Sequence, residues 1–238
     1  MDFPEDSIQY VLEDWWQTTT PGDSPRRGDL IRVMVPFKFG LPSRIVAKRR
    51  EDQPGDHESV EFEVQQFSFD SKPPRERLPI AGLPHMEDGA YQLTPFKKRP
   101  ALVLASAADP LDQKLTNGLA GYQKTPCFLV APYYGVDKNG SRAGYPEPLV
   151  RAIRNCTYPH YFWDCLPLKG DTASSLLRLD SMFSVVSDRH YYQHTGYKLS
   201  SDAMEIMAEY VDWYLSGSLP KNSLIRDVRA KLEELGEM

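Results

Sequence analysis

Short apolar runs that end at turn signals are the feature that most restricts how this chain can fold. Such runs are typical of strands, and none approaches the roughly 20 apolar residues of a membrane-spanning helix. Turn-forming residues, such as the Asp-Lys-Asn-Gly sequence at 137–140, separate them. The pattern predicts a mainly β chain that folds as a small antiparallel barrel or sandwich. The runs are residues 30–35, 99–105, 126–134, 158–163 and 176–186.

Residues 1–27 are predicted to form an N-terminal helix and a linker. Asp6 and Ser7 provide a capping signal in front of apolar residues at helical spacing. The polar residues 18–27, which include Pro and Gly, then lead to the body of the protein. We expect the helix to dock on this body, with partner binding as the alternative. The apolar positions are Ile8, Val11, Leu12, Trp15 and Trp16.

The C-terminal part of the chain is predicted to be helical. Ser200 and Ser201 cap a helix whose apolar stripe belongs to the core and which closes at Gly217. Residues 218–238 form an amphipathic tail that either packs on the body, pairs with a second copy of itself or frays. The two stripes are Met204, Met207, Val211 and Tyr214, and then Leu224, Val228, Leu232 and Leu235.

A long stretch between the first two core strands, residues 41–98, differs in character from the rest. Prolines recur through it among clusters of mixed charge, and only residues 59–65 alternate as a strand does. We interpret it as an insertion, either partly disordered or folded as a small subdomain. The chain thus divides into residues 1–27, a barrel domain of residues 28–217 interrupted at 41–98, and the tail.

Charge and cysteine content indicate the cellular setting. The net charge of −5 is mostly that of residues 1–27, so the body is near neutral and permits a local basic cleft without predicting one. The three cysteines contain no Cys-x-x-Cys pair, and the acidic N-terminus is unlike a signal peptide. His190 with His194, and Cys156 with His160 and Cys165, lack metal-site spacing. We expect a cytoplasmic protein without a metal, a cofactor or a membrane partner.

Arg178 and Asp180 are the charged residues of an otherwise apolar run at residues 176–180. In a strand their side chains would point the same way, roughly 6–7 Å apart. A permanent cation beside a carboxylate is suited to moving a proton at a phosphate. The same pair is also common as an ordinary surface ion pair, so on its own it leaves both interpretations open.

The chain carries five motifs in order, at residues 28–31, 98–104, 128–132, 177–180 and 196–200. Together they resemble the MazF/PemK/Kid toxin family. That family has a Gly-Asp-Ile/Val strand, an Arg-Pro-x-Leu/Val-Val strand, a strand that ends in Val-Pro, an Asp-centred strand, and a Gly-x-Leu-Ser/Thr lead-in to a C-terminal helix. The resemblance covers residues 28–40 and 98–217 and implies an SH3-like barrel of the CcdB/PemK type with a C-terminal helix.

The resemblance also implies a function. Family members are metal-independent, toxin-like endoribonucleases that act on single-stranded RNA, form homodimers and are restrained by an antitoxin protein. In their reaction a ribose 2′-OH attacks the adjacent phosphorus and leaves a 2′,3′-cyclic phosphate and a 5′-OH end. This chemistry needs a base, a proton donor for the leaving oxygen and positive charge at the phosphorane.

Carried over by position, the resemblance assigns catalytic roles to three residues. Asp180 would be the base, and Arg178 would be the acid or, as we prefer, the phosphorane clamp, because arginine gives up a proton only at great cost. Arg99 would bind phosphate in two-pronged fashion, or alternatively form a structural salt bridge. Tyr133 and Tyr134, which stand where many members have Thr or Ser, would contact RNA together with Lys98.

Departures from the family leave two other functions open. A loop that carries His or Glu in Kid-like members is displaced here by the insertion, so His85 or Glu87 replaces it only if the insertion folds back. One alternative is therefore a non-catalytic barrel that serves as an interaction module or poisons a protein target. The other is a different enzyme whose active site lies within residues 41–98.

Overall fold

The computed structural model describes residues 3–12, 14–37, 42–48, 61–66, 92–109, 111–137, 144–168 and 174–236. The chain divides into two compact units. The larger contains Met1–Met34 and Lys98–Met238, and the smaller contains Val35–Lys97. Among the described residues, no helix is both long enough and apolar enough to span a membrane.

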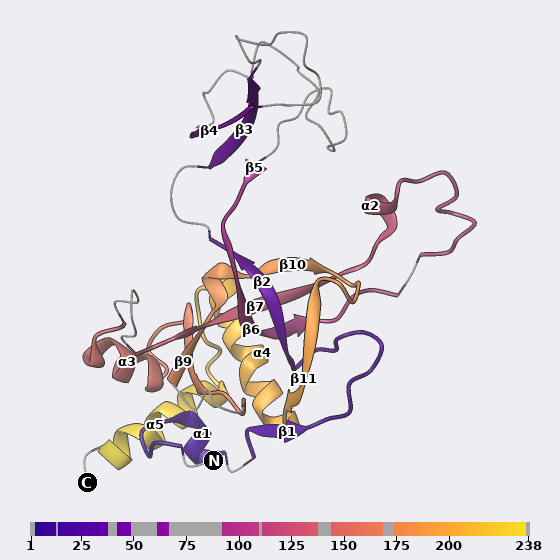
Figure 1. Cartoon of the computed structure of the whole chain (residues 1–238). Helices are drawn as coiled ribbons and strands as arrows, with labels where there is room; N and C mark the ends of the chain where they lie inside the picture. Colours follow the sequence, from indigo (N-terminus) through magenta and orange to yellow (C-terminus); the bar gives the residue numbers. More distant parts are fainter. Residues whose placement is uncertain are drawn as a thin grey trace. The chain divides into compact units, whose positions relative to one another are not determined.

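The larger unit is a mainly antiparallel β half-barrel with a few helices, as Figure 1 shows. In the described part of the chain its sheet has the strand order β1-β11-β2-β6-β7-β9-β8, and β10 pairs with β7. The predicted antiparallel β architecture is confirmed at this level. The strands are β1 (Trp16–Thr18), β2 (Asp29–Pro36), β6 (Phe96–Ala105), β7 (Cys127–Gly135), β8 (Tyr161–Cys165), β9 (Ser174–Arg178), β10 (Phe183–Val186) and β11 (Tyr192–Leu199).

The apolar run at residues 176–186 is two strands, not one. β9 ends at Arg178, a 3₁₀ turn follows at Leu179–Ser181, and β10 begins at Phe183. Both strands pair with β7, β9 along its second half and β10 along its first. The turn between them places Leu179 in the core with no exposed surface. The prediction that Asp180 lies on a strand was therefore wrong, because the chain turns after Arg178 and its next strand pairs with a different part of β7.

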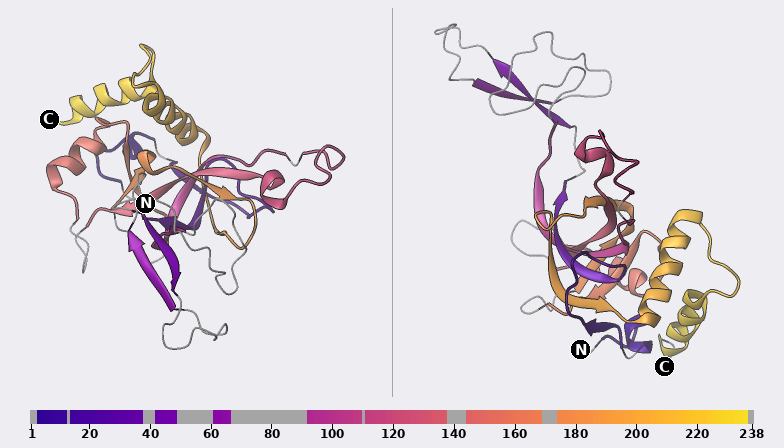
Figure 2. Two further views of the ribbon diagram at one scale, coloured as in Figure 1. Left: turned by 90° about the horizontal axis from the view of Figure 1, so that it is seen from above. Right: turned by 90° about the vertical axis from the view of Figure 1, so that its right-hand side faces the viewer.

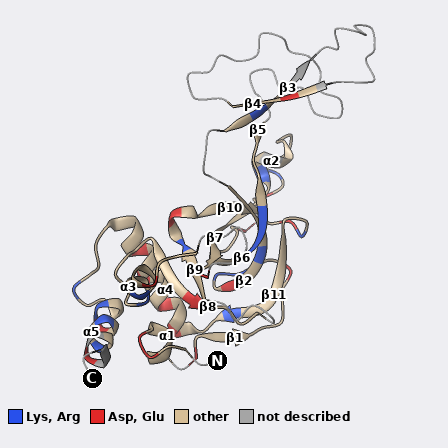
Figure 3. Ribbon diagram, turned by 60° about the vertical axis from the view of Figure 1, so that its left-hand side comes forward, with Lys and Arg blue, Asp and Glu red and all other residues tan. Residues whose placement is uncertain are grey.

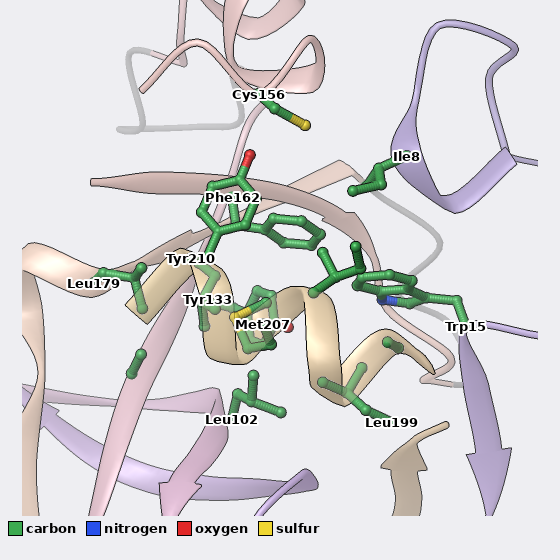
Figure 4. Close-up of a cluster of buried hydrophobic side chains, with 14 of the residues drawn as sticks. Ile8, Trp15, Leu102, Tyr133, Cys156, Phe162, Leu179, Leu199, Met207 and Tyr210 are labelled. Atoms are coloured by element: carbon green, nitrogen blue, oxygen red, sulfur yellow. The ribbon is translucent and has the colours of Figure 1, made fainter. Parts of the chain in front are cut away.

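The main core lies between one face of the sheet and the C-terminal helices. Helix α4 (Ser201–Ser216) begins at Ser200, whose Oγ accepts a hydrogen bond from the Ala203 amide at 3.2 Å, and ends at Gly217 with a φ of 75°. Both end signals confirm the predicted helix. In Figure 4, Met207 of this helix lies beside Tyr133 and Leu102 of the sheet, Tyr210 lies beside Phe162, and all five side chains are buried.

The C-terminal tail packs on the body. Helix α5 (Leu224–Gly236) lies beside α4 in both views of Figure 2, and it also contacts α1 (Ile8–Val11). Its buried residues are Ile225, Val228 and Leu232. Two further short helices, α2 (Gly121–Lys124) and α3 (Glu147–Arg154), lie between β6 and β7 and between β7 and β8.

The predicted N-terminal helix is mostly absent. Only Ile8–Val11 is helical, and Trp16 already belongs to β1, where it pairs with Leu199. Trp15 is 1% exposed, and its carbonyl accepts a hydrogen bond from the Ser200 amide. The two indoles have partners deep in the body that only an extended backbone reaches, so tertiary contacts override the helical spacing.

The smaller unit contains a three-stranded antiparallel sheet in its described part. Its strands are β3 (Ser43–Lys48), β4 (Glu61–Gln66) and β5 (Gln92–Leu93), in the order β4-β3-β5. β4 corresponds closely to the predicted strand at residues 59–65, whereas β3 was not predicted. His85 and Glu87 lie outside the described residues.

Candidate functional site

Arginine and tyrosine side chains alternate across four neighbouring strands. The guanidinium carbon of Arg99 (β6) lies 4.4 Å from the ring centroid of Tyr134 (β7). Arg178 (β9) lies 5.6 Å from the same ring and 5.0 Å from the ring of Tyr161 (β8). We call these four residues the Arg–Tyr ladder. Each cation–π contact contributes about 0.5–2 kcal/mol of interaction energy, and the value rises as the contact is shielded from solvent.

Strand alternation explains why the four ladder side chains share one face. The chain neighbours Tyr133, Leu177 and Phe162 all point into the core beneath α4. Tyr134, Arg178 and Tyr161 therefore point to the opposite face. Strand pairing completes the alignment, since Tyr161 is directly opposite Arg178.

Asp180 is held against Arg178 by a two-pronged ion pair. Arg178 donates from Nε to Oδ1 at 2.7 Å and from Nη2 to Oδ2 at 2.5 Å. The side chains are 13% and 26% exposed, respectively. The 3₁₀ turn brings the carboxylate much closer than the separation expected along a strand. Forked pairs of this kind are the strongest arrangement of these two groups.

The pKa values favour a positively charged, protonated site. Hydrogen bonds from Arg178 to Asp180 raise the pKa of the guanidinium further above its usual range, so Arg178 stays charged. Burial raises the pKa of Tyr134, and the nearby Arg99 and Arg178 offset this only in part. Tyr134 therefore stays a neutral phenol that is able to donate a hydrogen bond. A permanently charged Arg178 is suited to binding an anion and is not suited to donating a proton as a general acid.

Two residues that were predicted to contact RNA lie elsewhere. Tyr133 is 2% exposed, and its hydroxyl donates to the buried Asp164 at 2.9 Å. Lys98 points to the face opposite Arg99, because the two are consecutive in β6, and its Nζ donates to Gln193 at 2.7 Å. Sequence adjacency had grouped Tyr133 with Tyr134 and Lys98 with Arg99, and strand alternation separates both pairs. Figure 3 shows the basic residues of β6 as a blue stretch.

The sequence prediction missed two tyrosines of the site. Tyr161 belongs to an aromatic run whose next two residues, Phe162 and Trp163, are buried. Tyr145 supplies a hydrogen bond that also favours the charged form of Arg178. A run of aromatic residues does indicate a strand, but the sequence does not show which of its rings meets an arginine on the next strand.

A second aspartate, Asp164, forms a separate cluster inside the core. It has no exposed surface and accepts hydrogen bonds from Tyr133 at 2.9 Å, Trp16 at 3.2 Å and Trp15 at 3.4 Å. Burial raises its pKa to about 7, and these hydrogen bonds limit the rise. With neutral donors and no described cation beside it, this carboxyl group joins the N-terminal segment to β7 and β8.

Within the described residues, no group of three or more His, Cys, Asp or Glu side chains is placed to hold a metal ion. His190 instead meets Asp188, with 2.6 Å between Nδ1 and Oδ1. The chain matches no protein-family model, no curated protein and no solved structure. The Arg–Tyr ladder with Asp180 is therefore the candidate site on the strength of its own geometry.

Proposed function

We propose that this protein is a toxin-like, metal-independent endoribonuclease that cleaves single-stranded RNA by attack of the 2′-OH on the adjacent phosphorus. The observation that carries the proposal is the gathering of Arg99, Arg178 and Asp180 around Tyr134. Two cations, a carboxylate and a neutral phenol are the groups that this chemistry requires.

The ladder also fits the form of the substrate. A single RNA strand presents phosphates and unstacked bases in turn, and proteins bind these with cations and aromatic faces. Arg99 and Arg178 supply the cations, and Tyr134 and Tyr161 supply the rings. A local site of this kind is compatible with the near-neutral charge of the body.

Each group has a role in the proposed step. Asp180 accepts the 2′-OH proton while the 2′ oxygen forms a bond to phosphorus, and Arg178 and Arg99 neutralise the phosphorane. The bond from phosphorus to the 5′ oxygen then breaks, and Tyr134 donates the proton that this oxygen needs. The products are a 2′,3′-cyclic phosphate and a 5′-OH end.

The family resemblance extends the proposal beyond the site. It adds an SH3-like closure of the half-barrel, a second copy of the chain that completes the substrate groove, an antitoxin protein as a partner and a cytoplasmic location. These expectations rest on the five ordered motifs rather than on the ladder.

Incubation of the full chain with a mixed-sequence RNA in excess EDTA tests the proposal. We expect fragments with 2′,3′-cyclic phosphate and 5′-OH ends, and no fragments with Arg99→Ala or Arg178→Lys. The matched control is Arg189→Ala, which removes an arginine from an exposed pair with Asp23 in the same unit. Equal cleavage by all variants would show that the site is misplaced. RNA binding without cleavage would favour an interaction module.

A further inference from the structure

A pocket lies on the face of the sheet opposite the Arg–Tyr ladder. Arg32 and Gln193 are directly paired between β2 and β11, so their side chains share a face. Lys98 reaches Gln193 on that face, whereas the next residue, Arg99, points to the ladder. The pocket has a volume of about 340 Å³ and is lined by Arg32, Leu168, Gln193, His194, Thr195 and Tyr197.

A β-bulge in β11 shapes this pocket. His194 pairs with Ile31 and Tyr197 with Leu30, so Thr195 and Gly196 are extra residues on the β11 side. Gly196 has a φ of 83°, which few residues other than glycine adopt, and the Thr195 hydroxyl donates to the Leu30 carbonyl. Bulges commonly redirect side chains beside binding sites. Here the bulge brings polar and aromatic side chains together at one point of an otherwise regular pair.

Among the described residues, no acidic side chain compensates the charge of the pocket. Arg32 is partly buried and makes no hydrogen bond or ion pair with any described residue. Lys98 at the margin contacts only the neutral amide of Gln193 among the described partners. None of the lining residues is acidic. A partly buried arginine without a counter-ion, beside an amide that donates as well as accepts, favours an anionic ligand that an arginine fork holds well, such as phosphate.

The remaining lining residues favour a planar group next to that anion. Tyr197 provides the ring, since it pairs with Leu30 beyond the bulge and Leu30 shares a face with Arg32. His194 follows Gln193, so its ring lies on the opposite face, where it meets Tyr192 with 5.3 Å between ring centroids. The volume lies within the range of small-molecule sites, which starts near roughly 300 Å³. Aromatic rings beside a phosphate-binding arginine are the usual surroundings of a nucleotide base.

We propose that this pocket binds a nucleoside monophosphate, with the phosphate on Arg32 and the base against Tyr197. The site is separate from the Arg–Tyr ladder, and the proposal does not depend on nuclease activity. Arg32 is the residue that decides affinity, because it is the charge in the pocket that has no counter-ion among the described residues.

Calorimetric titration of the full chain with adenosine 5′-monophosphate tests this site. The ladder also offers arginine and tyrosine to a nucleotide, so the titration is repeated with Arg99→Ala, in which the ladder loses one of its two cations and the pocket keeps its own. We expect binding to survive in Arg99→Ala and to weaken at least about tenfold in Arg32→Gln, which keeps a polar side chain without the charge. Arg151→Gln, on the exposed side of α3, is the matched control and should bind as the parent does.

Two further probes measure separately how much the phosphate and the nucleoside contribute to binding. Inorganic phosphate should compete with the nucleotide, and adenosine without phosphate should bind at least about tenfold more weakly. Circular dichroism of each variant establishes that it is folded, and Arg32→Lys, which restores the charge, should recover part of the affinity. The proposal is overturned if the parent does not bind the nucleotide at millimolar concentration. It is equally overturned if binding is lost in Arg99→Ala but kept in Arg32→Gln, or if adenosine binds as tightly as the nucleotide.

Discussion

Two aspartates on opposite faces of the sheet show how strongly the surroundings decide what a carboxyl group does. Asp180 lies against the Arg178 guanidinium at the partly exposed Arg–Tyr ladder, whereas Asp164 is buried among neutral hydrogen-bond donors. The consecutive Tyr133 and Tyr134 face one aspartate cluster each, because a strand alternates its side chains. The comparison of Asp180 with Asp164 suggests a general distinction. A partly exposed carboxylate beside a cation can take part in a reaction, whereas a buried carboxyl group among neutral donors links parts of the structure.

The largest expected effect is the loss of RNA cleavage in Asp180→Asn. The side-chain amide that replaces the carboxylate has the same size and still touches Arg178, but it does not accept a proton from the 2′-OH. We expect the cleavage rate to fall about 10²–10⁴-fold, with thermal stability nearly unchanged. Asp164→Asn should cleave RNA as the parent does. If the two substitutions reduced cleavage equally, the functional distinction between the aspartates would be wrong.

The second effect is a pH dependence of stability that belongs to Asp164. Its pKa is about 7 in the folded protein and near 3.8 in the unfolded chain, so the folded state holds a proton that the unfolded state has lost. The free energy of unfolding should therefore be highest below about pH 4 and fall as the pH rises to about 7, by about 4 kcal/mol from this group. Urea denaturation of the parent and of Asp164→Asn across this range isolates the contribution. If the free energies of unfolding of the parent and of Asp164→Asn changed in parallel with pH, this prediction would be wrong.

A third effect is the stability cost of removing each carboxyl group at pH 5. Asp164→Ala leaves two indole N–H groups and one phenol without an acceptor in the core, which should cost about 3 kcal/mol. Asp180→Ala removes one partly exposed ion pair and should cost about 1 kcal/mol or less. Chemical denaturation measures both. A larger loss in Asp180→Ala would mean that the ladder is a structural element rather than a binding site.

The smallest effect separates the two adjacent tyrosines. Tyr134→Leu removes the ring between two arginines and should weaken binding of a short single-stranded RNA about tenfold. Tyr133→Phe removes one donor to Asp164 and should lower the free energy of unfolding by about 1 kcal/mol without changing RNA affinity. Fluorescence anisotropy with a labelled RNA and urea denaturation read the two quantities separately. An RNA affinity lowered by Tyr133→Phe would contradict the assignment of faces.

Local signals were sufficient for the strands and for the C-terminal helix. The alternating or continuous apolar runs near residues 30–35, 99–105 and 126–134 correspond to β2, β6 and β7. Ser200 and Gly217 mark the two ends of α4 as expected. These signals succeed because the apolar pattern of a strand and the capping of a helix depend on residues that are close in sequence. The N-terminal helix failed because Trp15 and Trp16 find hydrogen-bond partners in Asp164, which is almost 150 residues away.

The candidate site was predictable only in part for the same reason. Arg99, Arg178, Asp180 and Tyr134 were identified by motif, and the structure brings them together. Tyr133 and Lys98 were grouped with them by adjacency and lie on the other face. Tyr161 was missed, because its contact with Arg178 depends on the register between β8 and β9.

The amino-acid sequence by itself determined that this chain forms an antiparallel β structure closed by a capped C-terminal helix, because periodicity and end signals act within a few residues. Only the tertiary structure decided which charged and aromatic side chains meet. Strand order and register align residues from distant parts of the chain, and each strand sends alternate side chains to opposite faces. For this reason the Arg–Tyr ladder, the buried Asp164 cluster and the pocket at Arg32 become apparent only when the strands are in place.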